Sequence, residues 1–141
     1  MKHYNFLILL ATTLSFSLAS CEKDDDPVSY DYHAHIAQPS SADKNIGDIL
    51  FIDVEFESHA GEAVEHINVR IFNKATLTQV YNKPSDPHLD GDVSVYQFQD
   101  QITLSTANGF SGGDWVIEAT VWGHDEGQDE VVETVEFHIH P

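Results

Sequence analysis

Strict alternation of apolar and polar residues, in short runs separated by turn residues, dominates this sequence from residue 30 to its end. In the run DILFIDVEFES (48–58), every second residue from Leu50 is apolar, and the residues between are mostly acidic. A strand sends successive side chains to opposite faces of its sheet, so a period of two indicates strands with one buried face. No segment shows the 3.6-residue period of an amphipathic helix, although AGEAVEH (60–66) has room for one turn. The pattern therefore predicts an all-β fold.

Seven runs carry this alternation, and turn-rich segments such as NKPSDPHLDGD and ANGFSGGD separate them. We expect strands over 30–37, 48–58, 65–72, 76–81, 93–104, 114–122 and 131–140. The fifth run is long and predicts a bulge near Asp100, and Glu133 interrupts the apolar face of the last run. Seven short antiparallel strands predict an immunoglobulin-like β-sandwich. The residues expected to face its core are Tyr30, Tyr32, Ala34, Ile36, Leu50, Ile52, Val54, Phe56, Ile67, Val69, Ile71, Trp115, Ile117, Ala119, Val121, Val131, Val135, Phe137 and Ile139.

The first twenty residues are expected to lie outside this domain. Residues 6–18, FLILLATTLSFSL, are apolar but too short for a comfortable membrane span, and Lys2 precedes them as in a secretory signal peptide. The next residues, LASC, end at Cys21 and resemble the lipobox of bacterial lipoproteins. That resemblance implies cleavage before Cys21, a diacylglycerol thioether on its sulfur and acylation of the new amine. An ordinary secretory signal with an incidental cysteine is the alternative.

The acidic run EKDDD (22–26) resembles the export signal of Bacteroidota surface lipoproteins. This resemblance implies a lipid-anchored protein at the outer membrane, facing outward, whereas a solvated tether is the simpler interpretation. Two or three acyl chains, at roughly 0.8 kcal/mol per buried methylene, would anchor the protein essentially permanently. We therefore expect a signal peptide over 1–20, a tether over 21–29 and a sandwich domain over 30–141.

The charge of the chain excludes several classes of partner. The formal net charge is −18, and loss of Lys2 with the signal peptide takes it to −19. Such an acidic protein is unsuited to nucleic acid and to peripheral binding of anionic headgroups. Cys21 is the only cysteine, so lipidation of its sulfur leaves no thiol for disulfides or thiolate chemistry.

The sequence carries no convincing catalytic motif. The run GFSGG (109–113) is better explained as a tight glycine-rich loop than as a nucleophile elbow, because no helix is expected after it. For the same reason no glycine-rich phosphate cradle precedes a helix. Acidic pairs are so abundant that none is distinguished as a glycosidase dyad. We therefore expect a binding domain and not an enzyme. Phe51, Phe72 and Trp122 are predicted on outward faces, where we expect their rings to pack beneath a neighbouring loop. Stacking on sugars or anchoring a partner protein is the alternative.

Histidine is unusually frequent: the chain has nine, and all but His3 lie beyond the signal peptide. The spacing H-x-H occurs at 33–35 and at 138–140, and a strand presents both members of such a pair on one side. Strands that alternate in direction would gather six histidines at one end of the sandwich. These are His33, His35, His59, His66, His88 and His124. Imidazoles among carboxylates suit Zn²⁺, Cu²⁺ or Ni²⁺, so we expect a metal site there, with surface polar histidines as the alternative.

Two stretches resemble periplasmic copper-binding sandwiches of the CopC kind: HAHI (33–36) and GGDWVIEATVWGHDEGQDEVVETVEFHI (112–139). The resemblance implies His33, His35 and His124 as copper ligands. In those proteins the free amine of an N-terminal histidine also binds the metal, whereas Cys21 would occupy that position here.

A second metal hypothesis concerns DPHLDGDV (86–93), in which Asp86, Asp90 and Asp92 offer oxygen ligands for Ca²⁺. The EF-hand spacing is missing, so a hairpin turn is the better interpretation. The sequence as a whole predicts a lipid-anchored outer-membrane binding domain without catalysis, with Zn or Cu as its first candidate ligand. An accessory or adhesive surface module that recognises protein or glycan is the alternative.

Overall fold

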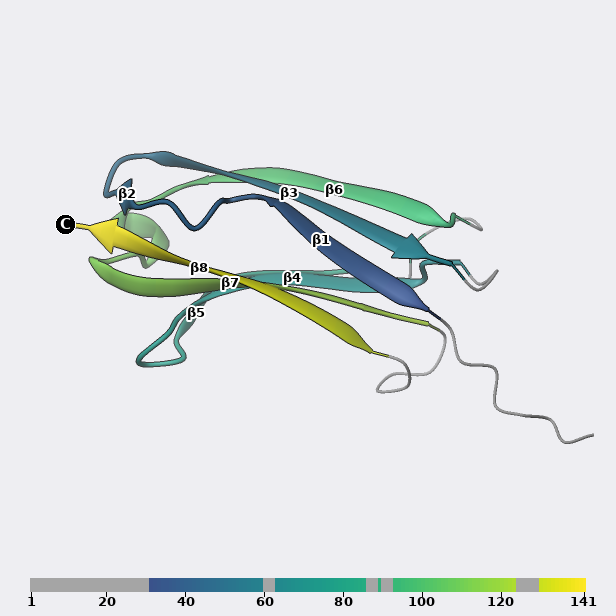
Figure 1. Cartoon of the computed structure of the whole chain (residues 1–141). Helices are drawn as coiled ribbons and strands as arrows, with labels where there is room; N and C mark the ends of the chain where they lie inside the picture. Colours follow the sequence, from purple (N-terminus) through teal and green to yellow (C-terminus); the bar gives the residue numbers. More distant parts are fainter. Residues whose placement is uncertain (1–30, 60–62, 86–88, 90–92, 124–129) are drawn as a thin grey trace, which may run out of the picture.

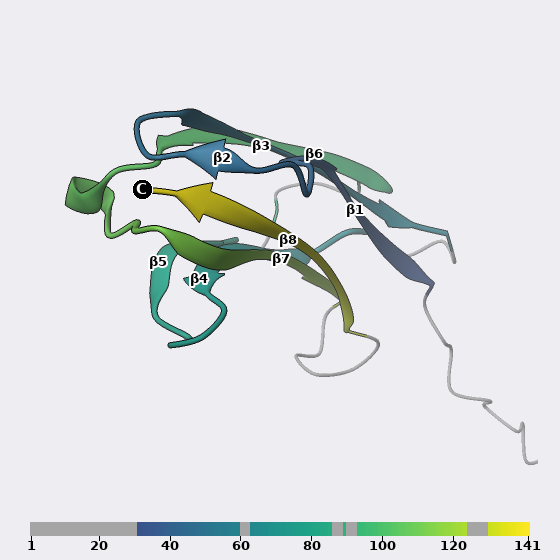
Figure 2. The ribbon, with the colours of Figure 1, turned by 60° about the vertical axis from the view of Figure 1, so that its left-hand side comes forward.

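The computed structural model describes residues 31–59, 63–85, 89, 93–123 and 130–141. These residues form two packed β-sheets (Figure 1 and Figure 2). The predicted signal peptide and tether, with Cys21, lie outside the described residues. No helix in the described part of the chain is long and apolar enough to cross a membrane.

One layer of the sandwich has three antiparallel strands, and the other has five (Figure 1). The first follows the order β1 (Tyr32–Gln38), β3 (Ile49–Ser58), β6 (Val95–Thr103). The second follows the order β2 (Lys44–Asn45), β8 (Val131–His140), β7 (Gly113–Trp122), β4 (His66–Asn73), β5 (Gln79–Pro84). Only β2 runs parallel to its neighbour, and a short 3₁₀ turn, η1 (Thr106–Asn108), lies between β6 and β7. The predicted all-β, immunoglobulin-like sandwich is confirmed.

The core lies between the two sheets and is built from the apolar positions of the alternating runs. On β3, Leu50, Ile52, Val54 and Phe56 are each at most 1% exposed. The inward faces predicted for β1, β3, β4 and β7 are buried as expected, whereas Val131 and Val135 of β8 are only partly buried. Leu104, which continues the alternation of β6 just beyond its end, is also buried. Connecting segments contribute two further core residues that alternation does not reveal: Val64 and Phe110.

Strand β5 begins three residues later than expected because a side chain organises the turn before it. The Asn73 Oδ1 atom accepts hydrogen bonds from the backbone N–H groups of Ala75 and Thr76, both at 3.0 Å. The backbone N–H of Asn73 donates to the carbonyl of Thr78, also at 3.0 Å. An asparagine that binds the backbone in this way favours a turn over a strand.

The bulge predicted near Asp100 is wrong. β6 pairs with β3 in unbroken register, from Ile49 opposite Thr103 to Glu57 opposite Val95. Register shifts occur instead in β1, between Ile36 and Gln38, and in the pairing of β4 with β5. Asp100 remains in a regular strand because a hydrogen bond satisfies its inward carboxylate.

Candidate ligand-binding site

The strand ends that carry the predicted histidines meet at one end of the sandwich. The backbone N–H of His59, just after β3, donates to the carbonyl of Asp31, just before β1, at 2.9 Å. In the other sheet, His66 at the start of β4 pairs with Trp122 at the end of β7. His88 and His124 lie outside the described residues.

Two of these histidines are in contact. The rings of His33 and His59 meet edge to face, with centroids 4.9 Å apart. The Nε2 atom of His33 lies 3.2 Å from Asp31 Oδ1, and that of His59 lies 3.2 Å from Glu57 Oε2. This end of the β1–β3 pair therefore combines two imidazoles and two carboxylates.

His35 and His66 lie apart from that pair. His35 Nδ1 is 4.0 Å from Glu133 Oε1 of β8. The His66 ring stacks on Trp122 in the five-stranded sheet, with centroids 5.4 Å apart and planes 11° from parallel. Within the described ranges, no group of three or more His, Cys, Asp or Glu side chains is placed to hold a metal ion.

The remaining pair lies at the opposite end of the sandwich. The rings of His138 and His140 have centroids 4.8 Å apart. Each is hydrogen-bonded to one carboxylate: His138 Nδ1 is 2.7 Å from Asp114 Oδ1, and His140 Nε2 is 2.9 Å from Asp43 Oδ2. Both histidines are thus separately hydrogen-bonded in this arrangement.

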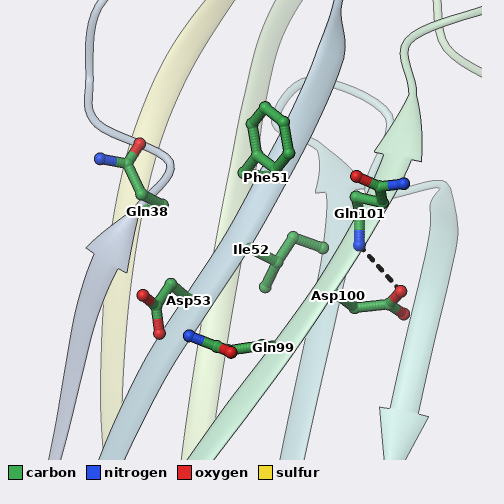
Figure 3. A pocket seen from close by; sticks show the side chains of 7 residues that line it. All are labelled: Gln38, Phe51, Ile52, Asp53, Gln99, Asp100 and Gln101. Carbon is green, nitrogen blue, oxygen red and sulfur yellow. Dashed lines mark hydrogen bonds between the residues drawn. The ribbon is translucent and has the colours of Figure 1, made fainter.

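An open depression of about 420 Å³ lies on the outer face of the three-stranded sheet. Figure 3 shows the Phe51 ring between the amides of Gln38 and Gln101, with Asp53 and Gln99 beside each other. We call this depression the Phe51 groove. Its lining residues are Gln38, Phe51, Ile52, Asp53, Gln99, Asp100 and Gln101.

The alternation of β3 and β6 places Phe51, Asp53, Gln99 and Gln101 outward. Leu50 and Ile52 of β3 face the core, so Phe51 and Asp53 face solvent, and the Phe51 side chain is 59% exposed. Cross-strand pairing sets Phe51 opposite Gln101 and Asp53 opposite Gln99. The ring is thus not packed beneath a loop, which was the expected arrangement for this outward aromatic residue.

The bulge in β1 supplies the third side of the groove. Ile36 pairs with Val54, but two residues later Gln38 pairs with Asp53 and not with Ile52. The extra residue turns Gln38 toward the outer face, as bulges commonly do next to binding sites. Gln38, Asp53 and Gln99 therefore form one row across all three strands.

Hydrogen bonds fix the floor and one wall of the groove. The Tyr81 hydroxyl, from the opposite sheet, donates to Asp100 Oδ2 at 2.7 Å. Within β6, the Gln101 backbone N–H donates to Asp100 Oδ1 at 2.8 Å (Figure 3). The bond from Tyr81 holds the pKa of Asp100 below its usual value. Burial and the same bond raise the pKa of Tyr81. On the outer side, the Gln97 amide donates to Asp53 Oδ1.

This arrangement suits a ligand that combines an apolar face with many hydroxyl groups. An exposed ring packs against the apolar face of such a ligand, and amides that both donate and accept can form hydrogen bonds with its hydroxyl groups. Sequence reasoning identified Phe51 as outward but missed Gln38, Gln99 and Gln101, because single glutamines in a strand look like ordinary solvated positions. The repeat QFQDQ (97–101), with glutamine at every second residue, was the available signal.

Solved structures of the CARDB domain of a protein from Pyrococcus furiosus are similar to this chain. A crystal structure of that domain in complex with di-metal ions is 17% identical, with a TM-score of 0.53 over 79% of this chain and 89% of that chain. A solution NMR structure of the same domain is 19% identical, with a TM-score of 0.52 over 78% and 94% of the two chains. At such identities the likeness shows the immunoglobulin-like fold alone. No protein-family model and no curated protein matches the sequence.

Proposed function

We propose that this protein is a non-catalytic, lipid-anchored surface module that binds glycans in the Phe51 groove. The observation that carries the proposal is an exposed aromatic ring of β3 in an open depression, flanked by amide side chains from β1 and β6. Sugars present apolar C–H faces to such rings, and their hydroxyl groups pair with amides that donate and accept. The predicted lipid on Cys21 would hold this groove at the outer membrane, where extracellular glycans are accessible.

The test is binding by the full-length protein, purified in detergent, to a glycan array and then to the best glycan by calorimetry. Replacing the ring in Phe51→Ala should weaken binding by about fivefold or more, because a central aromatic anchor contributes more than about 1 kcal/mol. Since Phe51 is 59% exposed, its loss should change the free energy of unfolding by no more than about 0.5 kcal/mol.

A matched control removes a ring from the other sheet. Phe72 of β4 lies beneath Arg70, whose guanidinium carbon is 5.2 Å from the ring centroid. Phe72→Ala should leave glycan affinity unchanged. The proposal fails if the wild-type protein binds no glycan, or if Phe51→Ala binds as tightly as the wild-type protein.

Metal binding is the second candidate function, favoured by the contact between His33 and His59 and by the carboxylates of Asp31 and Glu57 beside them. Two imidazoles with carboxylate oxygens are suitable ligands for Zn²⁺ or Cu²⁺. Rotation of the two carboxylates toward a shared ion would complete the ligand set. That all six predicted histidines contribute to one metal site stays a prediction.

Thermal unfolding with and without Zn²⁺ or Cu²⁺ tests the metal hypothesis. Free metal at one hundred times its dissociation constant should stabilise the protein by about 2.7 kcal/mol. The double variant His33→Ala/His59→Ala should lose this shift, and His138→Ala/His140→Ala should keep it. A wild-type melting temperature that neither ion changes would end the hypothesis.

A further inference from the structure

We infer that the ligand of the Phe51 groove is an uncharged glycan and that this face of the protein rejects polyanionic glycans. The inference rests on the proposed function and adds the chemical class of the ligand. It follows from the distribution of charge around the groove.

The sheet that carries the groove has carboxylates but no cations. Along their described lengths, β1, β3 and β6 contain no lysine or arginine. Asp53, Glu55 and Glu57 occupy successive outward positions of β3, and Asp53 lines the groove itself. Successive outward residues of a strand are about 7 Å apart, which is within the Debye length of about 8 Å at physiological salt. A sulfate or uronate bound beside Phe51 would therefore be repelled by at least one carboxylate.

The four cations of the described residues belong to the other sheet and its connections: Lys44, Arg70, Lys74 and Lys83. Arg70 Nε is 2.6 Å from Glu118 Oε1, so its charge is already paired. Lys83 Nζ lies 5.8 Å from the centroid of the Tyr81 ring, whose hydroxyl binds Asp100. Its charge acts on Asp100, where it contributes to the lowered pKa of that carboxyl group. None of these four cations lines the Phe51 groove, so an anionic sugar bound there would find no lysine or arginine among the lining side chains.

The polar groups of the groove fit hydroxyl groups better than charged groups. Gln38, Gln99 and Gln101 carry neutral amides, each with two N–H donors and an acceptor oxygen. Asp53 can only accept, and its Oδ1 atom already receives the Gln97 amide. The row from Gln38 to Gln99 crosses two inter-strand spacings, about 10 Å, so the contact surface is long enough for more than one sugar ring.

The experiment compares polymers that share a backbone and differ in charge. The full-length protein is titrated with dextran, mannan and xylan, and with the carboxymethylated and sulfated derivative of whichever neutral polymer binds. We expect the neutral polymer to bind at least tenfold more tightly than its derivatives at low salt. The difference should narrow at 0.5 M salt, because screening reduces repulsion at this exposed face.

Charge-neutralising variants separate repulsion from a poor fit of the derivatised sugar. Glu55→Gln, on the same face but outside the groove, should narrow the difference in affinity between the neutral polymer and its charged derivatives. It should leave affinity for the neutral polymer within about twofold. Glu130→Gln, which precedes β8 in the other sheet, is the matched control and should change neither affinity.

The outcomes distinguish the inference from the proposed function. Equal or tighter binding of a sulfated or carboxymethylated polymer overturns the inference and leaves glycan binding standing. Binding of polylysine with no binding of any glycan overturns both, and shows that the acidic face takes a basic protein segment instead.

Discussion

At the scale of single residues, Asp100 shows how a charge can occupy an inward strand position without distorting the strand. Its neighbours at the alternate inward positions, Phe98 and Ile102, pack against the core. The Tyr81 hydroxyl, from a side chain that is 7% exposed, crosses from the other sheet to bind the Asp100 carboxylate. The pair therefore connects the two layers beneath the Phe51 groove.

Tyr81→Phe removes the donor and leaves the Asp100 carboxylate without its partner from the opposite sheet. We expect the free energy of unfolding at pH 7 to fall by about 1.5–3 kcal/mol, the range for a hydrogen bond to a charged group. Urea denaturation measures the change. Asp100→Asn, which keeps an acceptor for Tyr81, should cost less, and an unchanged midpoint in Tyr81→Phe would contradict this account.

The same pair predicts how stability depends on pH. The pKa of Asp100 is lowered from 3.8, so its contribution is present above that value and is lost as the pH falls through the folded-state pKa. The pKa of Tyr81 is raised from 10.0, so its contribution is present below that value and is lost as the pH rises above it. Urea midpoints should be level between about pH 5 and 9 and decline on both sides. In Tyr81→Phe the urea midpoint should decline less steeply at both low and high pH. Unchanged slopes would show that the Tyr81–Asp100 pair is not the cause of the pH dependence.

At the scale of elements, Glu133 explains the interruption that the sequence shows in the last strand. The Glu133 Oε1 atom accepts a hydrogen bond from the backbone N–H of Ile36 at 3.3 Å, which joins β8 of one sheet to β1 of the other. β1 is an edge strand, and a covered edge has fewer free N–H groups for pairing with another chain. The carboxylate therefore replaces an apolar side chain because an edge amide needs an acceptor.

Glu133→Leu would restore the alternation of β8 but leave the Ile36 N–H without this acceptor. We expect a loss of about 1 kcal/mol in the free energy of unfolding and faster hydrogen exchange at the Ile36 amide. Glu133→Gln keeps an acceptor oxygen and should behave like the wild-type protein in both measurements. A gain in stability for Glu133→Leu would show that apolar burial outweighs the hydrogen bond.

The sequence predicted the strands well and the side-chain clusters less well, for a physical reason. Alternation identifies which face of a strand is buried, and it placed Phe51 outward correctly. It does not say which strands are neighbours. It therefore could not separate His33 on β1 and His59, just after the paired strand β3, from His66 in the other sheet. The bulge in β1 that turns Gln38 outward was also not predicted, because one extra residue in a strand does not change the composition of the sequence.

At the scale of the whole molecule, the lipid that we propose on Cys21 would decide where the protein works. Cys21→Ala should abolish the mass increase of lipidation and move the protein from the membrane fraction to the soluble fraction. The melting temperature should be unchanged, because the predicted tether separates this residue from the sandwich. Mass spectrometry and fractionation measure both effects, and a variant that stays in the outer membrane would contradict lipid anchoring.

Replacing the three aspartates at 24–26 with asparagine tests export to the cell surface separately from lipid attachment at Cys21. This variant should keep its lipid but lose exposure to protease added outside intact cells. If it remains equally accessible, the acidic run serves only as a solvated spacer.

The pairing of β1 with β3 also sets the orientation of the molecule. Tyr32, where the chain enters the sandwich, lies opposite Ser58 at the last position of β3, whereas Phe51 lies seven residues back along that strand. At about 3.3 Å per residue, the ring stands roughly 23 Å from the point of entry. A protein anchored to the membrane through its N-terminus would thus hold the Phe51 groove near the end of the sandwich that is farther from the lipid headgroups, where it faces the surrounding medium.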